Sequence, residues 1–332
     1  MVTLKDIARI ANVSVSTVSK VLNGKGRVSE KKRREILQVA KELGYVPNLH
    51  ARNMSKKVRI LTIGLVIPDI TNPFFGKLTR GVQKVCGEDV LVITADSFRD
   101  LDREERIIRK LLFLGAHGII IGNSRVNDEL VKEVSRYIPV VVFDKDYEYE
   151  NVVSIVLDNS YGAYLATKHL IERGYRNVIH LGGTHELYVS LKRREGYEAA
   201  MREKGLSPRV YPVGYDEEKG YKMMRKLLKS GEEIDGVFSM NDLVALGAMR
   251  AIREFGKKIP EDIGVVGFDN DEELCEIASP SLSSVHQPVE EMGETAAKVM
   301  LDMINGTLKV RKYIFSPRLV VRESSGGKKV NL

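Results

Sequence analysis

Apolar positions near the start of the chain recur every three or four residues in three short stretches, which is the spacing of one helix face. Thr3 and Asp6 can form a capping box at the start of the first stretch. Either Ser14 or Ser16 can cap the second stretch, and Ser29 can cap the third. The pattern therefore predicts three short helices, at about residues 4–11, from one of the two serines to residue 22, and from residue 30 to the glycine at 44.

The pattern changes from residue 60 onward, where apolar runs without polar alternation are separated by amphipathic helices. Such runs are typical of strands that are buried on both faces of a parallel sheet. They predict two doubly wound parallel sheets, and hence a small all-α headpiece joined to an α/β two-lobed domain. The predicted strands of the first series are residues 61–67, 90–95, 118–121, 139–143 and 152–157, and those of the second are 178–181, 209–213, 236–239 and 264–268.

Charge is distributed unevenly along the chain. Residues 1–60 contain 14 Lys and Arg against 4 Asp and Glu, whereas the whole chain has 52 against 45. Positive charge on one small module is what binding to DNA phosphates requires. On the second predicted helix Val15, Ser16, Ser19 and Lys20 share the face opposite the apolar one, where a recognition helix reaches base edges, and Lys20 could donate to guanine.

The cysteines, the hydropathy of the chain and the absence of known motifs each argue against certain classes of protein. Cys86 and Cys275 are single and far apart, so we expect neither a zinc site nor a disulfide, and a reduced cytoplasm fits best. The sequence has no secretory signal pattern and no apolar run long enough to span a bilayer, so we expect no membrane association. Phosphate-binding loops and hydrolase motifs are missing, and the acidic run at 269–273 lacks the glycine of a calcium loop. We therefore expect no enzyme, no cofactor and no metal.

Residues 3–54 resemble the headpiece of the lactose-repressor (LacI/GalR) family of bacterial transcription regulators. The resemblance rests on residues 5–8, 13–23, 28–29 and 42–48, in the order and at the spacing of the family. It implies a helix-turn-helix headpiece at 1–46, a hinge helix and linker at 47–59, and an effector-binding and dimerisation domain at 60–332. The expected DNA-contacting residues are Thr3, Ser14, Val15, Ser16, Thr17, Ser19, Lys20, Asn23, Asn48, His50, Ala51, Arg52 and Met54.

Met54 stands where the family usually has a leucine. The resemblance implies that this apolar side chain pries open a minor-groove step of the operator. The alternative is that Met54 only touches the hinge of the partner subunit.

The resemblance covers the large domain as well. It implies a first lobe at about 60–158 and 288–318, and a second lobe at about 159–287 and 319–330. As in periplasmic sugar-binding proteins, the ligand would lie between the lobes at the carboxyl ends of the strands.

Sugars present CH faces and hydroxyl edges, so a sugar site combines aromatic rings with planar hydrogen-bonding groups. Asn72, Phe74 and Phe75 follow the first strand and fit this chemistry, although the two phenylalanines could also be core residues that open a helix. For Asp242, a helix cap is the favoured interpretation. The motifs of the family imply further ligand contacts, and Tyr215 falls where the family often has an aromatic ring. The remaining expected ligand residues are Asp144, Arg193, Asn241, Asp269 and Gln287.

We therefore expect a homodimeric repressor of sugar-utilisation genes that binds a near-palindromic operator. A monosaccharide between the lobes, with ribose as the first choice, would control operator affinity. One alternative is a global regulator that answers to a phosphorylated carrier protein, and another is a sugar-binding or sugar-converting protein without a regulatory role. The end of the chain lacks a leucine heptad, which favours a dimer over a tetramer. The sequence leaves open whether the sugar is an inducer or a corepressor.

Overall fold

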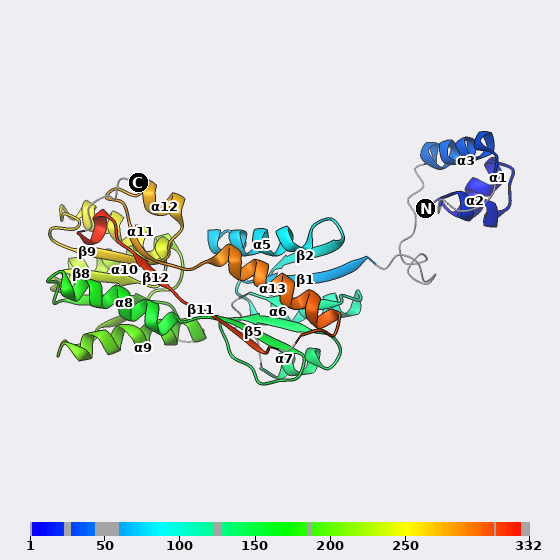
Figure 1. Ribbon diagram of the computed structural model, residues 1–332. Helices are drawn as coiled ribbons and strands as arrows, with labels where there is room; N and C mark the ends of the chain where they lie inside the picture. Colours follow the sequence, from blue (N-terminus) through cyan, green and yellow to red (C-terminus); the bar gives the residue numbers. More distant parts are fainter. Residues whose placement is uncertain are drawn as a thin grey trace. The chain divides into compact units, whose positions relative to one another are not determined.

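The computed structural model describes residues 2–22, 28–43, 60–122, 128–184, 187–308 and 310–326. The chain divides into two units, Met1–Ile60 and Leu61–Leu332 (Figure 1). None of the described helices is long and apolar enough to cross a membrane.

The first unit contains three short helices, α1 (Leu4–Ile10), α2 (Val15–Leu22) and α3 (Glu30–Glu42). The capping box is present at α1, where the Thr3 amide donates to Asp6 Oδ2 at 2.9 Å. At α2, Ser14 is the capping residue, because its Oγ accepts from the Thr17 amide at 3.1 Å. One apolar face of each helix forms the core of this unit, made of Ile7, Ala8, Ala11, Val18, Val21, Ile36 and Ala40.

The second unit has two six-stranded sheets, and we call each sheet with its helices a lobe. In the first lobe the strand order is β11-β5-β4-β3-β1-β2, with every neighbouring pair parallel. The strands are β1 (Leu61–Ile67), β2 (Val90–Asp96), β3 (Gly118–Ile121), β4 (Val140–Phe143), β5 (Val152–Leu157) and β11 (Lys312–Phe315). The helices are α5 (Pro73–Cys86), α6 (Leu101–Phe113), α7 (Asp128–Ser135) and α13 (Val289–Ile304).

Helices cover both faces of the first sheet, which is why its strands are apolar on both sides. Core residues of α5 and α13 pack on one face, and those of α6 and α7 pack on the other. Helices α5 and α13 lie side by side (Figure 1). A Cβ atom at Gly81 would lie 2.1 Å from the carbonyl oxygen of Glu290, so this close approach requires glycine.

In the second lobe the strand order is β12-β10-β9-β8-β6-β7. The strands are β6 (Val178–Gly182), β7 (Val210–Pro212), β8 (Gly236–Ser239), β9 (Gly264–Asp269), β10 (Ser283–His286) and β12 (Arg318–Val320). The helices are α8 (Asn159–Glu172), α9 (Tyr188–Glu203), α10 (Glu217–Lys229), α11 (Asp242–Glu254), α12 (Glu272–Ile277) and the short 3-10 helix η1 (Glu323–Ser325).

Two features of this second sheet differ from the sequence-based expectation. Strand β12 runs antiparallel to β10, whereas the other neighbours are parallel. Strand β10 was not predicted, because its sequence Ser-Ser-Val-His contains no apolar run. The buried Ser283 and Ser284 occupy this strand because their hydroxyls have hydrogen-bonding partners.

The chain crosses between the lobes at residues 157–159, 286–289 and 315–318. These crossings leave from or arrive at β5, β11, β10 and β12, which form one edge of each sheet. The opposite edges are β2 in the first lobe and β7 in the second. The connections therefore lie on one side of the cleft, and the carboxyl ends of the strands face the space between the lobes.

Candidate functional site

A pocket lies between the two lobes and is lined by residues at the ends of strands from both sheets. The space between its lining atoms, including the part open to solvent, is about 390 Å³. All nine predicted ligand residues line it, together with two residues that were not predicted, Arg99 and Met240. The full lining is Asn72, Phe74, Phe75, Arg99, Asp144, Arg193, Tyr215, Met240, Asn241, Asp269 and Gln287.

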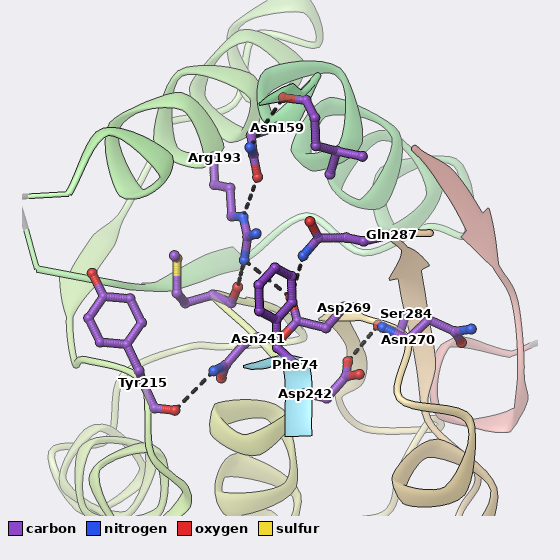
Figure 2. A network of polar contacts seen from close by, with 12 residues as sticks. Phe74, Asn159, Arg193, Tyr215, Asn241, Asp242, Asp269, Asn270, Ser284 and Gln287 are labelled. Carbon is purple, nitrogen blue, oxygen red and sulfur yellow. Dashed lines mark hydrogen bonds and ion pairs between the residues drawn. The ribbon is translucent and has the colours of Figure 1, made fainter. Parts of the chain in front are cut away.

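Arg193 on α9 is the buried cation of this pocket, and Figure 2 shows it reaching between Asn159 and the second sheet. Its Nε donates to Asn159 Oδ1 at 2.8 Å and its Nη1 donates to the carbonyl of Met240 at 2.5 Å. The guanidinium lies 3.6 Å from the centroid of the Phe268 ring. Burial lowers the pKa of Arg193, whereas the negative charges of Asp269 and Asp144 oppose this shift. A guanidinium so fixed can offer its remaining N–H groups to a ligand.

Two carboxylates face this cation from opposite lobes, the buried Asp144 and the half-buried Asp269. Asp144 follows β4 in the first lobe, and burial raises its pKa to about 6 although the charge of Arg193 lowers it. Asp269 ends β9 in the second lobe, lies 3.7 Å from Arg193 Nη1, and has its pKa raised by burial. Both carboxylates can accept hydrogen bonds from hydroxyl groups in the pocket.

The amides of Gln287 and Asn241 also line the pocket. Gln287 donates from Nε2 to Asp269 Oδ1 at 2.6 Å. Within the described part of the chain, Gln287 Oε1 is a buried atom with no hydrogen-bonding partner. The side chain of Asn241 bridges two segments, since Nδ2 donates to the Tyr215 carbonyl at 2.9 Å and Oδ1 accepts from the Val244 amide at 2.9 Å. An unpaired buried acceptor is costly, so a donor from a ligand would stabilise Gln287.

The two predicted phenylalanines lie at the boundary between the hydrophobic core and the pocket. Phe74 and Phe75 belong to the hydrophobic core and also line the pocket, with ring centroids 5.0 Å apart in an edge-to-face arrangement. Asn72 caps α5, because its Oδ1 accepts from the Phe74 amide at 3.0 Å. The Tyr215 hydroxyl is 2.9 Å from Ser190 Oγ, so the ring of Tyr215 is held in place.

The interpretation of Asp242 as a helix cap is wrong. The cap of α11 is Asn241, one residue earlier. The side chain of Asp242 is instead part of a buried hydrogen-bond network. Its carboxylate accepts from the Asp271 amide at 2.8 Å and from Ser284 Oγ at 2.5 Å, as Figure 2 shows for Ser284. Burial, with the nearby charge of Asp269, raises the pKa of Asp242 to about 8.

We predict that Asp242 makes the stability of the protein depend on pH. Near neutral pH, Asp242 is protonated in the folded protein. The same side chain is ionised in the unfolded chain, where the pKa of an aspartate is 3.8. The free energy of unfolding should therefore fall as the pH rises, by about 2 kcal/mol between about pH 6 and about pH 8. Asp242→Asn should remove most of this fall in urea unfolding, because its amide cannot ionise and Ser284 can accept from it. Asp216→Asn, at the exposed cap of α10, is the control and should keep it. An unchanged slope in Asp242→Asn would assign the proton to another group.

On the headpiece, several predicted DNA-contacting residues are exposed to solvent. Val15 is 41% exposed, and Thr3, Ser14, Ser16 and Lys20 are also exposed. Thr17 and Ser19 are half-buried on α2. Ser14 Oγ lies 2.8 Å from both Ser16 Oγ and Thr17 Oγ1, so these three hydroxyl groups are hydrogen-bonded to one another. The predicted contacts at Asn23, Asn48, His50, Ala51, Arg52 and Met54, and the predicted hinge helix at 47–59, lie outside the described residues.

Sequence reasoning missed three residues of the interlobe site: Arg99, Asn159 and Met240. Arg99 lies three residues after β2, Asn159 two after β5 and Met240 one after β8. The rule that ligands bind at the carboxyl ends of parallel strands would have pointed to all three. Their residue types alone did not distinguish them from their neighbours.

Comparison with known proteins matches both parts of the chain. Residues 3–48 match the model of bacterial regulatory proteins of the lacI family, and residues 167–325 match a periplasmic binding protein-like domain. The ribose operon repressor of Halalkalibacterium halodurans is 35% identical over 329 residues, which is 98% of this chain and 98% of that protein.

Two solved structures are similar as well. The transcriptional regulator CelR–cellobiose complex is 30% identical with a TM-score of 0.73, covering 98% of this chain and 100% of that one. A LacI family transcriptional regulator from Enterococcus faecium with bound ribose is 29% identical with a TM-score of 0.71, covering 79% of this chain and 98% of that one. With its helix-turn-helix unit, its two-lobed domain and a relative that matches it over almost its whole length, the chain belongs to the LacI family of bacterial transcription regulators.

Proposed function

We propose that this protein is an operator-binding transcription repressor of sugar-utilisation genes, whose affinity for DNA is controlled by a monosaccharide, with ribose as the first choice. It acts as a homodimer on a near-palindromic operator. Because it binds DNA inside a bacterial cell, it acts in the cytoplasm. Similarity to the ribose operon repressor of H. halodurans and to the ribose-bound regulator of E. faecium supports this choice.

The observation that carries the proposal is the combination of polar groups in the pocket. Asp144 and Asp269 can accept from sugar hydroxyls, Arg193 can donate to them, and Gln287 Oε1 needs a donor. Phe74 offers an apolar ring to the CH face of a sugar. A neutral polyol fits this set, whereas an anion would meet two carboxylates around a single buried guanidinium.

The same arrangement gives the sugar a means to control DNA binding. Asp144, Phe74 and Asn72 belong to the first lobe, and Arg193 and Asp269 belong to the second. A sugar that contacts both sets binds the closed arrangement of the lobes more tightly than an open one, so it shifts the equilibrium between them. If the two arrangements hold the headpieces of a dimer differently, sugar binding and operator binding are coupled and each changes the affinity for the other.

We predict that D-ribose stabilises the purified protein against thermal unfolding. A ligand at about 100 times its dissociation constant adds about 2.7 kcal/mol to the free energy of unfolding. The measurement is a thermal-shift series with D-ribose, and D-glucose and cellobiose serve as control sugars. Operator binding with and without ribose, followed by fluorescence anisotropy, then shows whether ribose is an inducer or a corepressor. A flat response to all sugars, with unchanged operator binding, would contradict the proposal and favour a protein or phosphorylated co-regulator.

A further inference from the structure

The loop after β2 holds Arg99 in an unusual backbone conformation. Phe98 has φ 52° and Arg99 has φ 59°, so two consecutive non-glycine residues adopt the left-handed conformation. Surrounding bonds fix them, because the Phe98 amide donates to Asp96 Oδ1 at 2.7 Å and the Arg99 amide donates to the Pro68 carbonyl at 2.9 Å. Such a conformation carries an energetic cost and occurs preferentially at functional sites.

The Arg99 side chain extends from this loop to the opposite lobe. Its Nη2 donates to Asp69 Oδ2 at 3.0 Å within the first lobe. Its guanidinium carbon lies 4.6 Å from the centroid of the Tyr215 ring, which belongs to the second lobe. A planar guanidinium over an aromatic ring is an attractive contact. Arg99 and Tyr215 therefore form a contact between the lobes, and both line the pocket.

Topology places this contact on the open side of the cleft. Arg99 follows β2 and Tyr215 follows β7, and these are the edge strands opposite the three crossings between the lobes. When the lobes open about the crossings, the edges at β2 and β7 separate the most. The Arg99–Tyr215 contact thus closes the mouth of the pocket when the lobes come together.

We propose that Arg99 is a specificity-determining residue, which closes the mouth of the pocket over a single sugar ring and excludes sugars that carry a further substituent on the side facing the mouth. This inference rests on the proposed function, because it concerns the sugar pocket. A ligand atom beyond the ring would have to occupy the space of the guanidinium or hold Arg99 and Tyr215 apart. Either change removes the interlobe contact and weakens binding of the extended sugar.

The test compares the dissociation constants of three neutral ligands by isothermal titration calorimetry. D-Ribose is the unextended sugar, and methyl β-D-ribofuranoside and 5-O-methyl-D-ribose are extended at opposite ends of the molecule. The wild-type protein should bind ribose at least about tenfold more tightly than the methyl derivative that is extended toward the mouth. In Arg99→Ala this preference should fall to about twofold or less, with only a modest loss of ribose affinity.

Lys77→Ala is the matched control. Lys77 Nζ on α5 lies 3.0 Å from Asp271 Oδ2 in the second lobe, so this pair also joins the lobes, but neither residue lines the sugar pocket. Its loss should weaken the three ligands by the same factor and leave the preference intact. Arg99→Gly, which suits the left-handed backbone, replaces Arg99→Ala should that variant fold poorly.

Two results would overturn the inference while the proposed function stands. In the first, wild-type protein binds both methyl derivatives as tightly as ribose. In the second, Arg99→Ala weakens all three ligands equally, as Lys77→Ala does, so Arg99 would only hold the lobes together. If wild-type protein binds none of the three ligands, ribose is not the sugar of this pocket, and the choice of ribose fails together with this inference.

Discussion

Replacing Arg193 with methionine should abolish the response of the protein to ribose and reduce its stability. Methionine keeps the apolar stem of the side chain on the Phe268 ring but removes the guanidinium. The bonds to Asn159 Oδ1 and to the Met240 carbonyl are then lost, together with the ion pair to Asp269. We expect ribose affinity to fall by at least about a hundredfold, since a charged group that donates to a ligand contributes about 2–5 kcal/mol.

The loss of stability has a separate cause. Removing one partner of a buried ion pair leaves an uncompensated charge and costs about 3–5 kcal/mol. Here both Asp144 and Asp269 would lose the positive charge that lowers their pKa. Their folded-state pKa values would rise further above the ordinary value of 3.8. Carboxylates of this kind stabilise the fold at low pH, and their contribution disappears as the pH rises through the folded-state pKa.

The stability difference between wild type and Arg193→Met should therefore be smallest near about pH 4, where the lost hydrogen bonds to Asn159 and Met240 remain, and largest near about pH 8. Urea unfolding at several pH values measures it, and calorimetry with ribose measures binding. Arg194→Met is the control on the same helix, because Arg194 pairs with Glu198 on the surface and its side chain is 43% exposed. We expect normal ribose binding in Arg194→Met. Normal ribose binding in Arg193→Met would remove Arg193 from the site.

The site could be predicted from sequence to the extent that its residues stand at the ends of apolar strands. Asn72, Asp144, Asn241 and Asp269 follow strands that the pattern located within about a residue of β1, β4, β8 and β9. Parallel strands bring their carboxyl ends to one edge, so residues far apart in sequence meet there. Arg193 and Gln287 do not follow a predicted strand, and they were found only through the resemblance to the family.

Other parts of the site depend on contacts that the sequence does not reveal. Asn241 and Asp242 are both good capping residues and both are buried, and a shift of one position decides which of them caps α11. The hydrogen-bond donors to Asp242 are Ser284 on β10 and the Asp271 amide. The pattern of apolar residues did not predict β10, and so it did not predict these contacts. Arg99 reaches the pocket only because β2 and β7 face each other across the cleft.

On the headpiece, replacing both Val15 and Lys20 with alanine should abolish the preference for the operator over other DNA. Val18 and Val21 of α2 are buried in the headpiece core, whereas Val15 and Lys20 of the same helix are exposed to solvent. A valine methyl can contact a thymine methyl, and a lysine can donate to guanine O6 or N7. Each base contact contributes about 1–3 kcal/mol, so the double variant should lose about a hundredfold or more in operator affinity.

Binding to a duplex of scrambled sequence should change far less, since that binding depends on total positive charge. Fluorescence anisotropy with a duplex that the wild-type protein selects from a random pool, and with its scrambled form, measures both affinities. Lys41→Ala removes one exposed positive charge from the end of α3 and should weaken the two duplexes equally. Ribose affinity should be unchanged in the double variant, because both substitutions lie in the first unit and the pocket lies in the second. If the double variant behaves like Lys41→Ala, then α2 contributes charge and shape to binding, and the reading of the bases must be assigned to other residues.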